Sequence, residues 1–238
     1  MTDKGRDPEA TRRLVELSHV VRHGMITHPG LPGPEITDHL TRADSRARYA
    51  DGVEFQIGRI SMVANTGTYV DAPSHRFVDG ADMSELPLSR LVDVAGVLVD
   101  PVPAELPAIG PETLARGVEQ VLGGAGVRGM AVLVRTGWDR HWGTDQYGRP
   151  GHPFLTAGAV AWLVEREPAV VGIDSVNIDD LADGGRPAHS GLLAAGIPIV
   201  EHLTGLAGLP ATGFRFHAAP VAVAGMGTFP VRAYAVIQ

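Results

Sequence analysis

The chain has 238 residues, of which 44% are apolar, and this is long enough to form one large domain with a buried core. Its formal net charge is −7 and it has no run of Lys or Arg, so nothing indicates a nucleic-acid-binding surface, and a small-molecule partner fits better. It has no cysteine, which excludes disulfides and thiolate chemistry and leaves metal binding to His, Asp and Glu.

The first residues, MTDKGRDPEATRR, are charged and lack the apolar stretch of a signal peptide. No apolar run approaches the ~20 residues that a membrane span needs. We therefore expect a cytoplasmic protein with no membrane partner, folded as one domain over residues 1–238, with a flexible stretch at residues 1–13.

Thirty glycines and eighteen prolines predict short elements rather than long helices. Apolar residues alternate with polar ones from Val15 to Val21, which predicts a first strand. The segment that follows is rich in turn residues, and the polar stretch ADSRARYADG reads as a flexible loop that could be a lid or an arm for a partner. Strand-like composition resumes from Glu54 to Ala64.

In the second half, short apolar runs bounded by glycines predict buried strands, and helical spacing predicts two longer helices between them. One helix follows Pro111 and ends at Gly123, and the other is capped by Thr156 and runs to Glu167. The remaining predicted elements are strands at residues 92–99, 130–134, 170–173, 197–201, 214–223 and 231–237, and a short helix at 192–195. Strands and helices intermix without the regular βαβ rhythm of a doubly wound sheet.

The segment NTGTYVDAPSHRF concentrates residues that carry chemistry. Side chains alternate faces along an extended backbone, so Asn65, Tyr69 and Asp71 share one face. Pro73 then redirects the chain and presents His75. Imidazole titrates near neutral pH, which makes His75 a candidate general acid and base; its alternative role is to hold the loop by hydrogen bonds.

A second segment, PAHSGLLAAGIPIVEHL, carries His189 and Glu201. Imidazole and carboxylate groups are common ligands of divalent cations, which can lower the pKa of bound water to about 7. Taken singly, each of these residues is more often structural than catalytic.

Both segments resemble the signature of the cyclase family, whose members include bacterial kynurenine formamidases and isatin hydrolases. The family pattern is H-x-G-T-H-x-D-x-P-x-H followed far downstream by H-x11-E. The phrases RTGWDRHW, HPFLT, VGIDSVNIDD and GFRFHAAPVAV are also similar to the family, so the likeness extends from Leu17 to the C-terminus.

The resemblance implies that Asp71, His189 and Glu201 ligate a metal and that His75 shuttles protons. Two leading His positions of the family pattern are Asn65 and Tyr69 here. A neutral amide and a phenol are poorer ligands for Zn than imidazole. We therefore expect one divalent ion, Zn or Mn. A harder ion with oxygen ligands, or a site without any metal, remains as an alternative.

The family also implies an α/β fold, namely a mixed sheet with a β-barrel-like core and flanking short helices, in a homodimer or homotetramer. The predicted activity is hydrolysis of an amide or a cyclic amide or imide by metal-activated water. Asn65, Tyr69, Trp138 and Arg186 are predicted to contact the substrate, although Trp138 could equally pack in the core. The alternatives are a cyclase or dehydratase acting on a natural-product intermediate, and a catalytically silent binding protein.

Overall fold

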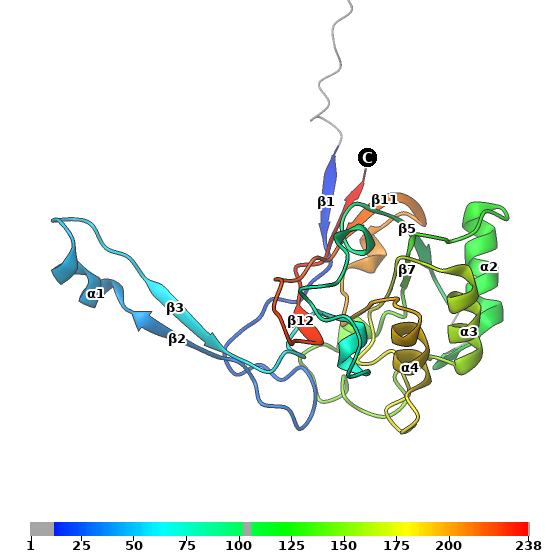
Figure 1. Cartoon of the computed structure of the whole chain (residues 1–238), viewed down its shortest axis with the longest axis horizontal. Helices are drawn as coiled ribbons and strands as arrows, with labels where there is room; N and C mark the ends of the chain where they lie inside the picture. Colours follow the sequence, from blue (N-terminus) through cyan, green and yellow to red (C-terminus); the bar gives the residue numbers. More distant parts are fainter. Residues whose placement is uncertain (1–11, 102–105, 238) are drawn as a thin grey trace, which may run out of the picture.

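The computed structural model describes residues 12–101 and 106–237, and its largest element is a nine-stranded mixed sheet that curls into a half-barrel (Figure 1). The predicted α/β class, with a barrel-like mixed sheet and flanking helices, is confirmed. In spatial order the strands are β1 (Arg13–Glu16), β13 (Tyr234–Ile237), β11 (Thr212–His217), β5 (Val94–Val99), β7 (Ala131–Val134), β9 (Val170–Ile173), β10 (Ile199–Glu201), β4 (Tyr69–Asp71) and β12 (Thr228–Pro230).

The middle of the sheet is parallel, because β5, β7, β9 and β10 pair in the same direction. The crossover helices are α2 (Pro111–Leu122), α3 (Ala157–Arg166) and α4 (Pro187–Ala194). Strands and helices thus alternate regularly over this part, and the expectation that they would not is wrong. The start of α4 was also predicted too late, near residue 192; the helix begins at Pro187, since proline is well suited to the first turn of a helix.

Successive residues of the central strands point to opposite faces and feed two separate cores. Val97 and Val99 face the helices, where they pack in a cluster that includes Leu114 and Leu163. Leu98 faces the hollow of the curled sheet and belongs to the other cluster. Burial on both faces explains why these strands read as continuous apolar runs in the sequence.

The ends of α2 and α3 form as their sequences predict. Gly123 ends α2 in a left-handed conformation with φ 56°, which glycine adopts without steric cost. The side chain of Thr156 accepts a hydrogen bond from the backbone N–H of Ala159 at 3.3 Å and so caps α3.

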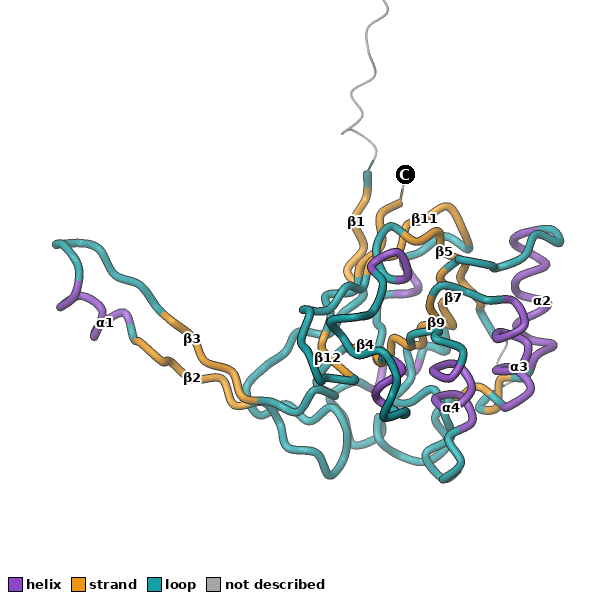
Figure 2. Tube along the Cα trace, viewed as in Figure 1, coloured by secondary structure: helices purple, strands orange, loops and turns teal. Residues whose placement is uncertain are grey.

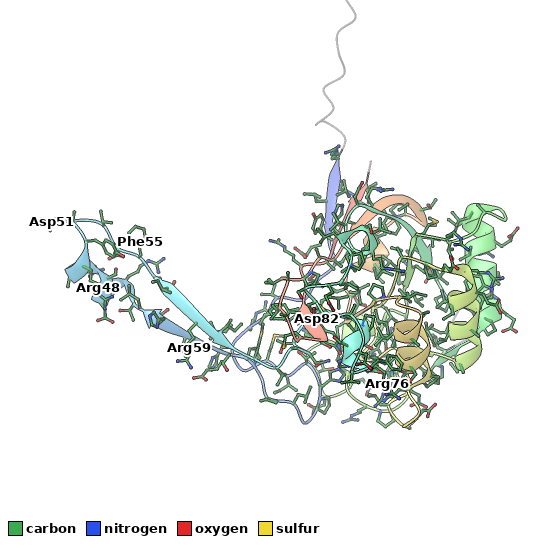
Figure 3. All side chains as sticks on the ribbon, viewed as in Figure 1. Arg48, Asp51, Phe55, Arg59, Arg76 and Asp82 are labelled. Carbon is green, nitrogen blue, oxygen red and sulfur yellow. The ribbon has the colours of Figure 1, made fainter. Side chains whose placement is uncertain are left out.

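A β-hairpin formed by β2 (Glu35–Leu40) and β3 (Ile57–Ser61) projects away from the half-barrel, and α1 (Arg42–Ser45) lies near its tip (Figure 1). Arg48, Asp51 and Phe55 surround this tip, far from the sheet (Figure 3). The polar stretch predicted to be a flexible loop therefore includes a helical turn, which Thr41 caps by accepting a hydrogen bond from Asp44 N.

Several predicted boundaries differ from the structure. Arg13 belongs to β1, so the predicted flexible stretch is wrong at that residue, while residues 1–11 lie outside the described part. The first strand ends at Glu16, before the predicted end at Val21, because the chain leaves the sheet there. A short parallel pair, β6 (Ala108–Ile109) with β8 (Phe154–Leu155), was not predicted. None of the helices formed by the described residues combines the length and apolar character needed to cross a bilayer.

Candidate metal-binding site

Strand pairing places four polar side chains on one face at the β10, β4 and β12 side of the sheet. Tyr69 and Asp71 are two residues apart on β4 and so share a face. Glu201 on β10 pairs with Tyr69, and Thr228 on β12 pairs with Asp71. Directly opposed residues on neighbouring strands lie on the same face. The site therefore follows from the register of the sheet, which joins segments over a hundred residues apart.

Thr228 fixes the orientation of both Asp71 and His75. Its hydroxyl donates to Asp71 Oδ1 at 2.5 Å and lies 2.8 Å from His75 Nδ1. Because the single hydroxyl proton goes to Asp71, the oxygen of Thr228 accepts from Nδ1–H of His75. The lone pair of His75 is then on Nε2, which lies 3.9 Å from Asp71 Oδ1. His75 is thus held as the tautomer that can act as a base or a ligand.

His189 is held by Asp179 at the start of α4. The buried carboxylate of Asp179 accepts hydrogen bonds from the backbone N–H groups of Ala188 and His189 at 2.6 and 3.0 Å. It also lies 2.6 Å from His189 Nδ1. An imidazole that donates Nδ1–H to a carboxylate presents a free Nε2, the arrangement common among metal-binding histidines.

Nε2 of His189 faces two buried carboxylates. It lies 3.6 Å from Asp71 Oδ2 and 3.9 Å from Glu201 Oε1, both too long for ordinary hydrogen bonds. Asp71 Oδ2 is buried and has no hydrogen-bond partner among the described residues. Buried polar atoms without partners are uncommon, and buried charges are normally paired or bound to metal. These residues therefore fit a divalent cation, which would satisfy Asp71 Oδ2.

The ionisation of this group of side chains is strongly perturbed. Burial opposes the charged form of His189, but its contacts with Asp179 and Asp71 outweigh burial and raise its pKa to about 10. Burial raises the pKa of Glu201 to about 7, with the Asp71 carboxylate adding to the effect. Perturbed acids and bases of this kind cluster at functional sites.

Asp71, His189 and Glu201 were predicted to meet, and the structure brings them together with His75. Asp71, His75 and His189 each offer one ligand atom within 4.8 Å of the others. A recess of 240 Å³ opens beside them and is lined by His75, Arg76, Asn177, Arg186 and His189. Arg76 lies beside α4 and donates to Ser190 Oγ at 3.3 Å (Figure 3).

The other predicted substrate contacts lie in different surroundings. The side chain of Arg186 donates to Asn177 Oδ1 at 3.3 Å at the rim of the recess. Asn65 is half-buried and hydrogen-bonds to Tyr69. Trp138 is buried in a separate cluster, where its indole N–H donates to the carbonyl of Tyr147 at 3.0 Å. Trp138 therefore packs within a hydrophobic cluster and does not line the recess.

A second cluster adjoins the first and contains two histidines that sequence reasoning missed. A long loop joins β1 to β2 (Figure 2). It carries His28, whose Nε2 lies 3.0 Å from Tyr69 Oη. If the strand continued past Glu201, alternation would point His202 to the opposite face. Instead β10 ends at Glu201, and His202 turns inward with φ 56°. Tyr69 donates to Glu201 Oε2 at 2.6 Å, which links the two clusters.

Burial keeps this second cluster uncharged. It lowers the pKa of His28 to about 4 and that of His202 well below its ordinary value. It raises the pKa of Tyr69 well above its ordinary value. The only sequence signal for His28 is its place before Pro29 in a turn-rich segment, which does not distinguish it from a surface histidine.

A curled mixed sheet with carboxylates and imidazoles gathered on one face defines the fold of a class of metal-dependent hydrolases. The Cyclase family model matches residues 15–180, and the chain belongs to this family. Its relatives include the kynurenine formamidase of Salinibacter ruber, 30% identical over 186 residues that cover 78% of this chain and 82% of the relative.

Solved structures agree with this assignment. Isatin hydrolase A from Labrenzia aggregata bound to benzyl benzoate is 28% identical, with a TM-score of 0.80 covering 95% of this chain and 94% of that one. A chain solved as a potential metal-dependent hydrolase with cyclase activity is 25% identical, with a TM-score of 0.75 covering 96% and 99%.

Proposed function

We propose that this protein is a metal-dependent hydrolase that cleaves the C–N bond of an amide or a cyclic amide or imide. The observation that carries the proposal is the unpartnered Asp71 Oδ2, which faces His189 Nε2 beside a second buried carboxylate. The names of the relatives, kynurenine formamidase and isatin hydrolase, support an amide or lactam as substrate.

Asp71, His189 and Glu201 are the proposed ligands of one divalent cation, Zn or Mn. Imidazole and carboxylate together suit such ions. When bound, the cation supplies a Lewis acid and lowers the pKa of its bound water to about 7. Asp179 orients His189, and Thr228 orients Asp71, so the ligands are positioned before the cation arrives.

His75 is the proposed general base and acid. Its Nε2 carries the lone pair, because Nδ1–H is held by Thr228, and its side chain is 34% exposed at the recess. It can take a proton from the attacking water and return it to the leaving nitrogen. The other role open to the same lone pair is that of a metal ligand, and the metal content of a His75 variant separates the two roles.

Arg186 and Arg76 place two cations at the rim of the recess. Guanidinium groups bind carboxylates through paired hydrogen bonds. We therefore expect the substrate to carry an anionic group beside its scissile amide. Tyr69 is almost fully buried and directs its hydroxyl to Glu201. Its proposed contribution to substrate binding, like that of Asn65, is limited to shaping the floor of the site.

The test uses purified, metal-loaded protein with aryl formamides and isatin-like lactams as substrates. His75→Ala is expected to abolish turnover and keep the bound metal, whereas Asp71→Asn is expected to lose both. Turnover retained by His75→Ala would refute its catalytic role, and loss of the metal would reassign it as a ligand. A metal-replete protein that is inactive on both substrate types would favour a cyclase or dehydratase.

The projecting hairpin supports assembly with a second copy of the chain. It exposes apolar side chains at its surface, including Tyr49, Phe55, Ile57 and Ile60, which are 46%, 53%, 49% and 50% exposed. Exposed apolar side chains gathered on one projecting element are typical of interaction sites. In light-scattering measurements, Phe55→Ser combined with Ile60→Thr is expected to lower the mass to that of a monomer. Leu88→Ser, which removes an exposed apolar side chain from the body, is the control.

A further inference from the structure

Three atoms from distant segments converge beside the first site and form a nearly equilateral triangle. Tyr69 Oη lies 3.0 Å from His28 Nε2 and 3.2 Å from His202 Nε2, and the two nitrogens are 3.2 Å apart. Tetrahedral ligands at bonds of about 2.0–2.1 Å from a zinc-type ion lie about 3.3–3.4 Å apart. The observed separations are close to that spacing.

The three atoms of this triangle face one another. Tyr69 donates its only proton to Glu201 Oε2 at 2.6 Å, so its oxygen faces the imidazoles with lone pairs. Only one hydrogen can lie between His28 Nε2 and His202 Nε2, which are 3.2 Å apart, so at least one of these nitrogens has a lone pair. Glu201 Oε2 is a fourth candidate ligand atom beside the triangle, and Glu201 Oε1 faces the first site. One carboxylate therefore borders both positions.

The surrounding structure holds this triangle in place. Tyr147 Oη lies 2.8 Å from His202 Nδ1, which leaves His202 Nε2 to face the cluster. The segment of His28 is tied to the strand region by a hydrogen bond from Gly67 N to Thr27 Oγ1 at 2.8 Å. Second partners of this kind orient metal-binding imidazoles. Thr27 and Tyr147, which flank the cluster, also line a recess of 720 Å³.

We propose that His28, His202 and Tyr69, with Glu201 as the fourth ligand, form a second binding site for a divalent transition-metal cation such as Zn²⁺ or Co²⁺. Two imidazoles with oxygen ligands suit these ions. The ligand set draws His28 from the loop after β1 and His202 from the turn after β10. The site stands whether or not Asp71 and His189 bind a cation of their own.

The experiment measures how many equivalents of Co²⁺ the chelator-treated, full-length chain binds, by calorimetry and visible absorption. The wild-type chain is expected to bind two. Tyr69→Phe, which removes one oxygen and keeps the buried ring, and His28→Ala should each bind one, or bind the second at least tenfold more weakly. His39→Ala, which removes an exposed histidine from β2, is the control and should bind two. Circular dichroism verifies that each variant is folded.

This experiment distinguishes the second site from the site of the proposed function. The wild-type chain could bind one equivalent of Co²⁺ that is lost in His28→Ala and kept in His189→Ala. This result would support the second site and refute the ligand set of the proposed function. The inference is overturned if Tyr69→Phe and His28→Ala both bind as the wild-type chain does. It is also overturned if the wild-type chain takes up no Co²⁺, since the triangle is then a hydrogen-bonded cluster alone.

Discussion

Replacing Asp179 with Asn tests whether the carboxylate behind His189 prepares the site for a cation. Three N–H groups point at Asp179, those of Ala188 N, His189 N and His189 Nδ1. An ionised carboxylate accepts from all three, whereas an amide has one oxygen and two N–H donors of its own. In Asp179→Asn the amide NH₂ must therefore face at least one N–H group.

The expected loss follows from the bond that is broken. A hydrogen bond to a charged group contributes about 1.5–3 kcal/mol, and each 1.4 kcal/mol is a factor of about ten in affinity. We expect Asp179→Asn to bind Zn²⁺ about 10–100-fold more weakly, as replacement of such orienting partners generally does. The imidazole of His189 also loses the partner that keeps its lone pair on Nε2.

Competition with a chromophoric chelator gives the affinity, and circular dichroism confirms that the variant is folded. Asp180→Asn is the matched control, because Asp180 is the next residue but its carboxylate accepts, among the described residues, from Ala182 N alone, at 2.9 Å. Unchanged Zn²⁺ affinity in Asp179→Asn would show that His189 does not bind metal through Nε2. An equal loss in Asp180→Asn would show that the effect is not specific to His189.

Three further predictions concern the same site. Metal at 100 times its Kd should stabilise the fold by about 2.7 kcal/mol and raise the Tm by about 5–10 °C. Asp71→Asn should remove this Tm shift in calorimetry. A Tm shift that persists in the variant would place the metal elsewhere. Because the pKa of His189 is raised from 6.5 to about 10, its stabilisation is full below pH 6.5 and is lost as the pH rises to 10. The Tm of metal-free protein should fall over that range, less steeply in His189→Gln, while Zn²⁺ binding tightens; equal slopes would contradict this. Arg186→Gln should raise KM for an anionic amide about tenfold and leave KM for a neutral one unchanged, and equal effects on both would rule out its proposed role.

The sequence by itself determined the elements of the parallel half of the fold. Apolar runs such as residues 130–134 and 170–173 must be strands buried on both faces, and Thr156 and Gly123 mark helix ends by local chemistry. The resemblance of two sequence segments to the family signature also implied that Asp71, His189 and Glu201 meet, and the structure places His189 Nε2 3.6 Å from Asp71 Oδ2 and 3.9 Å from Glu201 Oε1.

Only the tertiary structure decided which further residues join them. The register of β4 against β12 brings Thr228 to Asp71, and no local pattern encodes a pairing across so many residues. Alternation along a continuing strand would point His202 away from Glu201, whereas β10 ends at Glu201 and the left-handed backbone of His202 turns its imidazole inward. His28 comes from a loop whose path is set by long-range contacts, and such contacts leave no periodic signal in the sequence.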